Sequence, residues 1–207
     1  MAPTASEKGQ GMPKIVNHDT RRAEIVAAAA QVVARVGLEA TTVRAIAAEA
    51  GYSSGVLDHY FHGKDDILLQ ALQASHRGIH ERLRVQLRGR RGLDALRAML
   101  LDNLPVDPQR LSEARLEIQF WARSLADPAL TRVQVRESGT FRGAIERYLH
   151  EAVADGVLAA AVNVKAEAQN LQAFVDGLSV HAAVDPARLT ARLQAQLLDR
   201  ELAGLDR

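Results

Sequence analysis

Two pairs of side chains in the middle of the chain have a helical spacing that suits ligand binding. Glu117 and Trp121 are four residues apart, so on a helix they share one face. A carboxylate beside an indole attracts an organic cation; the alternative is that Trp121 fills core and Glu117 is solvated. His76 and His80 have the spacing of metal ligands. However, no third ligand is evident, and 77–79 lack the Glu of a zinc-protease motif. We therefore predict no metal site and no cofactor.

Other aromatic and polar residues fall on helices that should enclose the same region. A small-molecule site is typically an apolar pocket with a few polar anchors. Our candidates for such a site are His76, His80, Glu117, Phe120, Trp121, Phe141, Tyr148, Asn170, Phe174 and His181.

Catalytic motifs are not evident. We find no Gly-rich phosphate loop, no nucleophile elbow and no convincing pair of carboxylates. Gly63-Lys64 lacks the upstream glycine spacing and the Ser/Thr of a Walker motif. Asp65 and Asp66 instead suit the positive N-terminal end of a helix. We predict that the protein is not an enzyme.

The segment 42–61 has the layout of a short helix, a glycine turn, a second helix and an aromatic end. The first helix has an apolar face at three- and four-residue steps, formed by Val43, Ile46, Ala47 and Ala50. Thr42 and Ser53 can cap the two helices, and Gly51 can leave the first with positive φ. This layout predicts a helix-turn-helix, which lays its second helix in the major groove of DNA. The alternative is an ordinary helical hairpin in an all-helical core.

The second helix has an inward side of Val56, Leu57 and Tyr60, which leaves its polar residues facing outward. We expect Gly55, Asp58 and His59 to face bases, where Asp58 would accept from a cytosine amine or repel wrong sites. Ser53, Ser54, Tyr60 and Lys64 would chiefly hold phosphates. The full set of predicted DNA-binding residues is Thr42, Arg44, Ser53, Ser54, Gly55, Asp58, His59, Tyr60 and Lys64.

Both flanks of this segment also read as helices. An apolar stripe over 20–36 stops at Gly37, and 61–68 opens a long helix. The chain here resembles the TetR (tetracycline repressor) family of transcriptional regulators. The matching segments are RRAEIVAAAAQVVARVG, ATTVRAIAAEAG, SSGVLDHYF and GKDDILLQAL, which cover roughly 21–72. The resemblance implies a three-helix DNA-binding head, a larger helical ligand-binding body and a homodimer.

Within the family, the HYF ending and the segments 117–126 and 174–182 are similar to the BetI-like branch, which contains choline-responsive repressors. That branch usually has an aromatic residue after an Asp-Gly-Leu triplet, whereas Ser179 follows the triplet here. The wider family often has Tyr where Asp58 stands and a small aliphatic residue where Tyr52 stands. These departures concern the effector and the operator and leave the fold unaffected.

Composition fits a regulator of this kind. The 207 residues are 47% hydrophobic, enough for a sizeable core, and they include no cysteine, which excludes disulfides and thiolate metal sites. No window approaches the roughly 20 apolar residues of a membrane span, and the N-terminus lacks the apolar region of a signal peptide. We therefore expect a cytoplasmic protein.

The formal net charge is only +1, so charge alone does not predict nucleic-acid binding. Local placement is sufficient if a few cations reach phosphates, and the candidates are Arg21, Arg22, Arg44 and Lys64. A second basic run is interpreted as a solvated helix face and comprises Arg77, Arg82, Arg84, Arg88, Arg90 and Arg91.

We predict an all-α fold of about nine helices in three parts. Residues 1–18 read as a flexible arm, which either touches DNA or is a disordered tail; 19–65 form the head and 66–207 the body. Three Asp-Pro pairs, at 107–108, 127–128 and 185–186, carry a helix-start signal. They divide the body near 92–104, 108–125, 128–154, 165–183 and 186–202.

The last two helices are predicted to form the dimer, although each apolar stripe also fits plain core. The stripes are Leu171, Phe174, Val175 and Leu178, then Leu189, Leu193, Leu197 and Leu198, with Ala173, Gly177 and Ala182 allowing close approach. Two recognition helices about one DNA turn apart would read a palindromic operator. Together these observations predict a ligand-responsive DNA-binding regulator, most simply a repressor released by a small molecule. The alternatives are a constitutive DNA-architectural protein and an all-helical enzyme.

Overall fold

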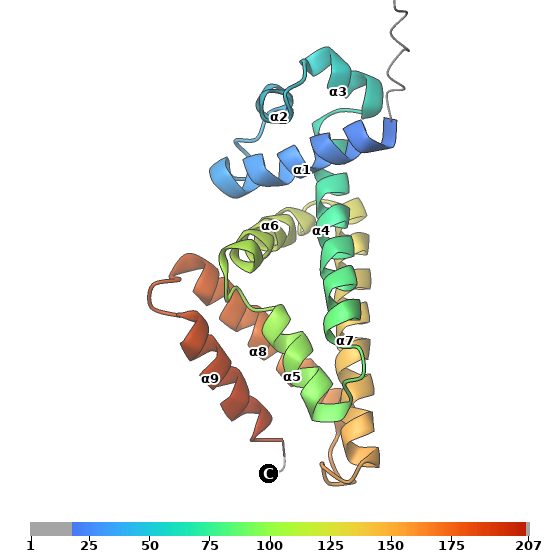
Figure 1. The fold of residues 1–207 in the computed structure, drawn as a ribbon, viewed down its shortest axis with the longest axis vertical. Helices are drawn as coiled ribbons and strands as arrows, with labels where there is room; N and C mark the ends of the chain where they lie inside the picture. Colours follow the sequence, from blue (N-terminus) through green and yellow to red (C-terminus); the bar gives the residue numbers. More distant parts are fainter. Residues whose placement is uncertain (1–17, 206–207) are drawn as a thin grey trace, which may run out of the picture.

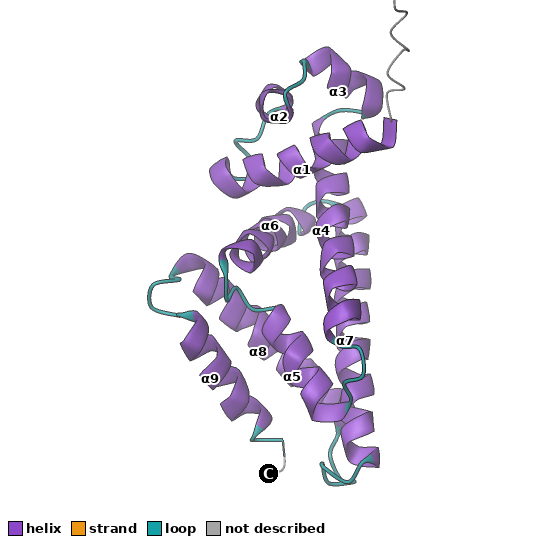
Figure 2. Ribbon diagram, in the orientation of Figure 1, coloured by secondary structure: helices purple, strands orange, loops and turns teal. Residues whose placement is uncertain are grey.

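The computed structural model describes residues 18–205, and the predicted arm at 1–18 lies outside this range except for His18. The described chain consists of helices joined by short loops, with no strand (Figure 2). The nine helices are α1 (His18–Val36), α2 (Val43–Ala50), α3 (Ser54–Tyr60), α4 (Lys64–Gln86), α5 (Gly92–Asp102), α6 (Pro108–Ser124), α7 (Pro128–Ala154), α8 (Val164–Val184) and α9 (Ala191–Leu202). The all-α prediction is confirmed.

The first three helices form a small head at one end of the molecule (Figure 1). Its core combines residues of α1, α2 and α3 with the first turns of α4, among them Ile25, Ile46, Leu57 and Ile67. α4 then runs out of the head into the body (Figure 1). The predicted boundary at 65/66 falls in the first turn of this continuous helix.

The turn between α2 and α3 follows the sequence signals closely. The Ala45 N–H donates to the Thr42 hydroxyl at 3.1 Å, which caps α2. Gly51 has a φ of 73°, a left-handed conformation that favours glycine over residues with a side chain. Ser53 occupies the N-cap position of α3, but its side chain makes no capping hydrogen bond. Within 18–205, the hydroxyl of Ser53 thus has no capping role.

The body is built around α5, α7 and α8, with α9 packed against α5 and α8. Its main core is aliphatic and includes Leu96, Leu100, Ile145 and Leu171, all fully buried. A third core cluster joins head to body, because it brings Val33 and Leu38 together with residues of α4, α6 and α7. Phe120 is buried at the centre of that junction.

Two of the three Asp-Pro pairs begin a helix, and the third does not. Asp107 and Asp127 cap α6 and α7, and each is followed by proline in the first turn. Asp185 accepts from the Arg188 N–H at 3.0 Å, but this closes only a single turn. α9 starts at Ala191 instead, where the Thr190 hydroxyl accepts from Leu193. The predicted helix over 186–202 thus began five residues too early, because the cap at Thr190, and not the one at Asp185, starts the helix.

The apolar stripes of α8 and α9 face mainly into their own subunit. Leu171, Val175, Leu178 and Leu198 belong to the main core, and Phe174, Leu189 and Leu197 pack against it. Among the small residues of α8, Ala173 and Gly177 are exposed and Ala182 is buried. The stripes are therefore chiefly core, and the homodimer stays a prediction. None of the helices described is long and apolar enough to cross a membrane.

Candidate functional site

The outer side of α3 is a polar surface at the end of the molecule farthest from the body (Figure 1). Ser54, Gly55, Asp58 and His59 are exposed, whereas Leu57 on the opposite side is 1% exposed. A helix held by one apolar anchor with its polar face outward is free to enter a groove. Four of the five α3 residues predicted to contact DNA are thus accessible together, and the fifth, Tyr60, is half-buried.

The flank of α3 that faces α1 is hollowed and aromatic. His18, Arg21, Ser53, Gly55, Val56, His59 and Tyr60 line this shallow hollow. The Tyr60 ring lies 5.4 Å from the His59 ring and 5.5 Å from the His18 ring, measured between centroids. Tyr60 is therefore half-buried, and its ring packs with the rings of His18 and His59.

The basic residues of the head divide into fixed and available groups. Arg22 donates to Gln70 at 2.9 Å and lies 4.9 Å over the Phe61 ring, so it joins α1 to α4. Arg44 on α2 is exposed, and Lys64 is half-exposed at the first residue of α4. Arg44 and Lys64 are consequently better placed than Arg22 to reach phosphates.

Tyr52 stands in the turn where the wider TetR family often has a small aliphatic residue, and its larger side chain makes contacts with α1. Its hydroxyl donates to Glu24 at 2.5 Å, and Arg21 lies 5.7 Å from its ring centroid. The hydrogen bond to Glu24 raises the pKa of Tyr52, with smaller contributions from burial and from the Glu24 charge. Tyr52 thus connects the turn to α1.

A cavity of about 200 Å³ lies in the body between α4, α5, α6, α7 and α8. Five of the ten predicted effector residues line it, namely His76, His80, Glu117, Trp121 and Phe141. The other five do not: Phe120 and Tyr148 are buried in core, Phe174 packs against the main core, and Asn170 and His181 are exposed on α8. The structure therefore brings together both candidates of α4, two of the three of α6 and one of the two of α7, but none of those of α8.

Glu117 is the central polar group of the cavity wall. One carboxylate oxygen lies 2.8 Å from Nε2 of His76 on α4, and the other accepts from the Trp121 indole N–H at 2.9 Å. Burial by itself lowers the pKa of His76, but the hydrogen bond and charge of Glu117, with the charge of Glu137, raise it above its usual value. The pair therefore favours a protonated imidazole between α4 and α6.

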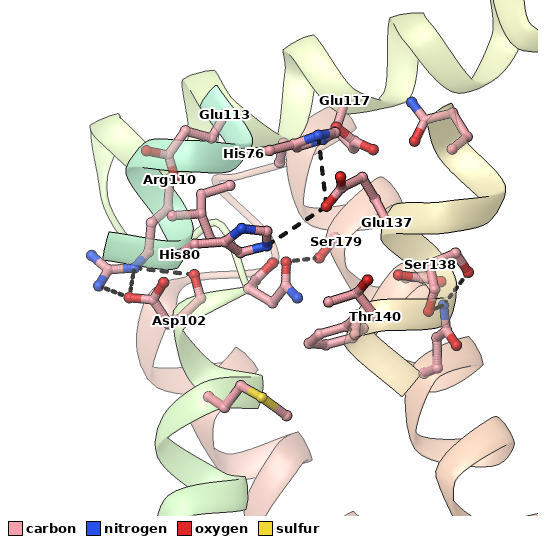
Figure 3. Close-up of a pocket in the computed structure, with 18 of the residues that line it drawn as sticks. His76, His80, Asp102, Arg110, Glu113, Glu117, Glu137, Ser138, Thr140 and Ser179 are labelled. Atoms are coloured by element: carbon pink, nitrogen blue, oxygen red, sulfur yellow. Dashed lines mark hydrogen bonds and ion pairs between the residues drawn. The ribbon is translucent and has the colours of Figure 1, made fainter. Parts of the chain in front are cut away.

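Glu137 points from α7 toward both histidines of α4 (Figure 3). Its carboxylate lies 4.0 Å from Nδ1 of His76 and 3.6 Å from Nε2 of His80, beyond hydrogen-bonding distance. No group of three or more His, Asp or Glu within 18–205 has an arrangement that fits a metal ion. The three residues form a cluster of ionisable side chains.

An ion-pair network closes one side of the cavity, and it includes an arginine that the sequence placed on a solvated face. Arg82 donates to Asp102 at 2.9 Å and to Glu113 at 2.8 Å. Arg110 pairs with the same Asp102 and with Asp107. The Asp102 side chain is 0% exposed, so two guanidinium groups compensate its buried charge. The interpretation of Arg82 as solvated was wrong, because α5 and α6 fold acidic residues over it.

Sequence reasoning missed several other polar residues of the cavity wall, among them Gln134 and Asp176. Burial and, secondarily, the charge of Glu117 raise the pKa of Asp176 from 3.8 to about 6. Gln134 is 8% exposed, and its Nε2 has no hydrogen-bond partner in the described chain. Helical periodicity gave no signal for Asp176, because it stands off the apolar stripe of Leu171, Val175 and Leu178.

An exposed recognition helix and a ligand-sized cavity, joined by one continuous helix, are the architecture of a DNA-binding regulator. Residues 25–71 match the model of the tetR family of bacterial regulatory proteins. Residues 92–207 match the model of the BetI-type transcriptional repressor C-terminal domain. The chain belongs to the TetR family, and its body is of the BetI type.

Known relatives agree with this assignment. The transcriptional regulator PksA of Bacillus subtilis (strain 168) is 30% identical over 181 residues, which cover 86% of each chain. The regulator BetI of Vibrio vulnificus (strain YJ016) is 29% identical over 185 residues, 87% of each chain. A regulator from Saccharomonospora viridis, solved in complex with choline, superposes with a TM-score of 0.83 at 22% identity, over 88% of this chain and 95% of the other. At 22% identity, the similarity to this last structure shows a shared fold.

Proposed function

We propose that the protein is a ligand-responsive repressor that binds a palindromic operator as a homodimer. Each subunit inserts α3 into a major groove, with Gly55, Asp58 and His59 at the bases and Ser53, Ser54, Tyr60 and Lys64 at the phosphates. The bound dimer occupies a promoter. An effector in the cavity of the body then changes the separation of the two heads. An effector that favours the released state a hundredfold contributes about 2.7 kcal/mol to release.

The observation that carries the DNA-binding role is the polarity of α3. Its only buried residue is Leu57, and its polar residues are exposed at the tip of the head. In an ordinary hairpin of an all-helical core, this face would be covered by another helix. A single seven-residue helix contacts few base pairs, so a two-fold operator and a dimer provide the specificity.

Direct contacts support a connection between the cavity and the head. α6 carries Glu117 and Trp121 on its cavity side, and Gln119 and Arg123 on its head side. Gln119 accepts from the Leu38 N–H at 2.5 Å, and Arg123 donates to Asp65 at the start of α4 at 2.7 Å. A ligand that moves α6 against α4 therefore acts on the base of the head.

Selection of bound fragments from the source genome tests the DNA-binding role. We expect the fragments to share a palindrome whose half-sites lie about 10 base pairs apart or a multiple of this, with two chains bound per site. His59→Ala should weaken this binding, whereas His150→Ala, an exposed histidine of α7, should not. Bound sequences without two-fold symmetry, or a strictly monomeric chain, would contradict the proposal.

Titration of metabolites into the protein–operator complex tests the response to ligands. A repressor of this kind is released by at least one small molecule that binds the body. A constitutive DNA-architectural protein is released by none, and this outcome would favour that alternative. The same titration of Trp121→Ala should require more effector for release, because Trp121 lies in the cavity wall. Operator affinity without effector should be retained, because Trp121 is not part of the head.

A further inference from the structure

We infer that the effector is a primary ammonium compound that carries a hydrogen-bond acceptor and an apolar substituent. This inference rests on the proposed role of the cavity as the effector site. It is more specific than a requirement for positive charge, because it requires hydrogens on the cationic nitrogen.

The cavity carries an excess of negative charge. Glu117, Glu137 and Asp176 line it from α6, α7 and α8. The other acidic residues of the wall, Asp102 and Glu113, are compensated by the guanidinium groups of the network described above. Of the remaining three carboxylates, Glu117 is paired with His76. Glu137 faces His80 at 3.6 Å, and Asp176 has no basic partner among the described residues. A cation therefore gains more here than a neutral or anionic ligand.

Two of these carboxylates lack hydrogen-bond donors. Asp176 forms no hydrogen bond or ion pair with another described residue, although it is largely buried. Glu137 has its closest basic nitrogen 3.6 Å away, on His80. A partly buried carboxylate without donors is costly, and an N–H from a ligand removes that cost. A primary ammonium offers three donors to such a cluster, whereas a quaternary ammonium offers none.

Gln134 supplies the independent observation that the cavity is built for a polar ligand. It lines the cavity from α7, is 8% exposed, and its Nε2 lacks an acceptor among the described residues. Buried amides are nearly always hydrogen-bonded in folded proteins. A hydroxyl on the ligand satisfies this amide in either orientation of its oxygen and nitrogen, since a hydroxyl both donates and accepts.

The rest of the wall combines uncharged polar residues, namely Asn103, Ser138, Thr140, Gln172 and Ser179, with apolar residues that accept the substituent. Ile79 and Leu83 of α4, Met99 of α5, Phe141 of α7 and Val180 of α8 line it. Among the described residues, Trp121 and Phe141 are the only Trp, Tyr or Phe side chains in this wall. A quaternary ammonium is typically held by a cage of several aromatic faces. Two aromatic residues and three carboxylates suit an ammonium that donates hydrogen bonds better than a methylated one.

The test compares two probes that differ only in the substituents on nitrogen: 2-amino-1-phenylethanol and its N,N,N-trimethyl derivative. Binding to the full chain is measured by calorimetry and by the fluorescence of Trp121, the single tryptophan. We expect the primary amine to bind at least tenfold more tightly at pH 7.5. Equal or tighter binding of the trimethyl compound overturns the inference.

Matched variants locate the effect. Asp176→Asn and Glu137→Gln should each weaken the primary amine about tenfold and reduce its advantage over the trimethyl probe. Glu167→Gln, on α8 but outside the cavity, should change neither affinity. Thermal unfolding of each variant shows that it is folded. An unchanged preference in both cavity variants contradicts the assignment of the carboxylates.

Operator binding separates this inference from the proposed function. If the selected operator is bound and released by some other metabolite, but neither probe binds, the repressor role stands and the ammonium inference fails. If no genomic fragment is bound, the proposed function fails whatever the probes do. Release of the operator complex by the primary amine, and not by its trimethyl derivative, supports both.

Discussion

The imidazole of His76 and the carboxylate of Glu117 meet at 2.8 Å and connect α4, which carries the head, to α6, which lines the cavity. The same carboxylate binds Trp121. A ligand that engages Glu117 must therefore compete with a contact that holds the two helices together. Variants of His76 or Glu117 can therefore test whether a ligand in the cavity changes the position of α4 relative to α6.

Replacement of Glu117 by Gln should destabilise the protein most at mildly acidic pH. A raised His76 pKa means that its stabilisation is full below about 6.5 and is lost as pH rises through the folded-state pKa. The hydrogen bond to a charged group contributes about 1.5–3 kcal/mol at most. Thermal unfolding between pH 6 and pH 8 should show the difference between wild type and Glu117→Gln shrinking with pH. A difference independent of pH would contradict the claim that Glu117 raises the pKa of His76.

Replacement of Asp176 by Asn should stabilise the protein, and this gain should grow as pH rises. The folded-state pKa of about 6 lies above the ordinary 3.8, so ionised Asp176 lowers stability, and this penalty grows from about pH 4 to pH 6. The two values correspond to at most about 3 kcal/mol. Asp176→Asn should gain stability relative to wild type as pH rises through this window. Chemical denaturation at pH 4, 5, 6 and 7.5 measures the gain; a constant difference would contradict a raised pKa.

The ionisation of Asp176 should also set the pH dependence of affinity for a cationic effector. Below about pH 6 Asp176 is neutral, and His76 is protonated. Both changes weaken the attraction for an ammonium group. The affinity of 2-amino-1-phenylethanol should therefore fall as pH is lowered from 7.5 to 5.5, and Asp176→Asn should show a smaller fall. Calorimetry at four pH values measures this directly, and tighter binding at pH 5.5 would be the contrary result.

Asp102 should be the most sensitive charged residue of the body. Its side chain is 0% exposed between Arg82 and Arg110. Asp102→Asn leaves two arginines without their shared partner, which costs about 3–5 kcal/mol for a buried pair. Asp94→Asn is the matched control, because Asp94 is 65% exposed and pairs only with Arg90 four residues earlier on the chain. An exposed pair contributes about 0.3–0.5 kcal/mol, and equal losses in the two variants would refute the burial argument.

The sequence predicted helices best where local capping signals decide the boundary. Asp107 and Asp127 begin α6 and α7, and Gly51 ends α2, because each acts on backbone groups within a few residues. The start of α9 was misplaced because Asp185 and Thr190 offer two caps in succession, and packing against α5 and α8 selects the second.

The cavity was predictable only in part, because its composition depends on contacts between distant helices. Glu117 and Trp121 were accessible from their four-residue spacing on α6. Arg82 and Asp102 are twenty residues apart and on different helices, so no local pattern reveals their pairing. The exposure of Asn170 and His181 depends on the rotation of α8, which is set by the packing of Leu171 and Val175 into the main core.

Lys64 provides a test of the phosphate contacts that is independent of base recognition. It is half-exposed at the first residue of α4, next to α3. Lys64→Ala should weaken binding to specific and non-specific DNA alike and reduce the slope of log affinity against log salt by about one. Arg88→Ala, an exposed cation in the loop after α4, is the control that should leave the slope unchanged. An unaltered slope in Lys64→Ala would exclude a phosphate contact.

Gly55 allows the DNA interface to be probed without disturbing the free protein. A Cβ added at this position meets no atom within 4 Å, and its φ is not in the left-handed region. Gly55→Ala should therefore fold normally and gain up to about 1 kcal/mol from better helix propensity. On DNA, however, the methyl group would stand between the α3 backbone and the groove that this backbone must approach closely. We expect a higher melting temperature together with at least tenfold weaker operator binding, measured on one preparation by thermal unfolding and by DNA titration. Unchanged operator affinity would show that α3 does not approach DNA through Gly55, and the docking proposed for this face would have to be rotated toward Asp58 and His59.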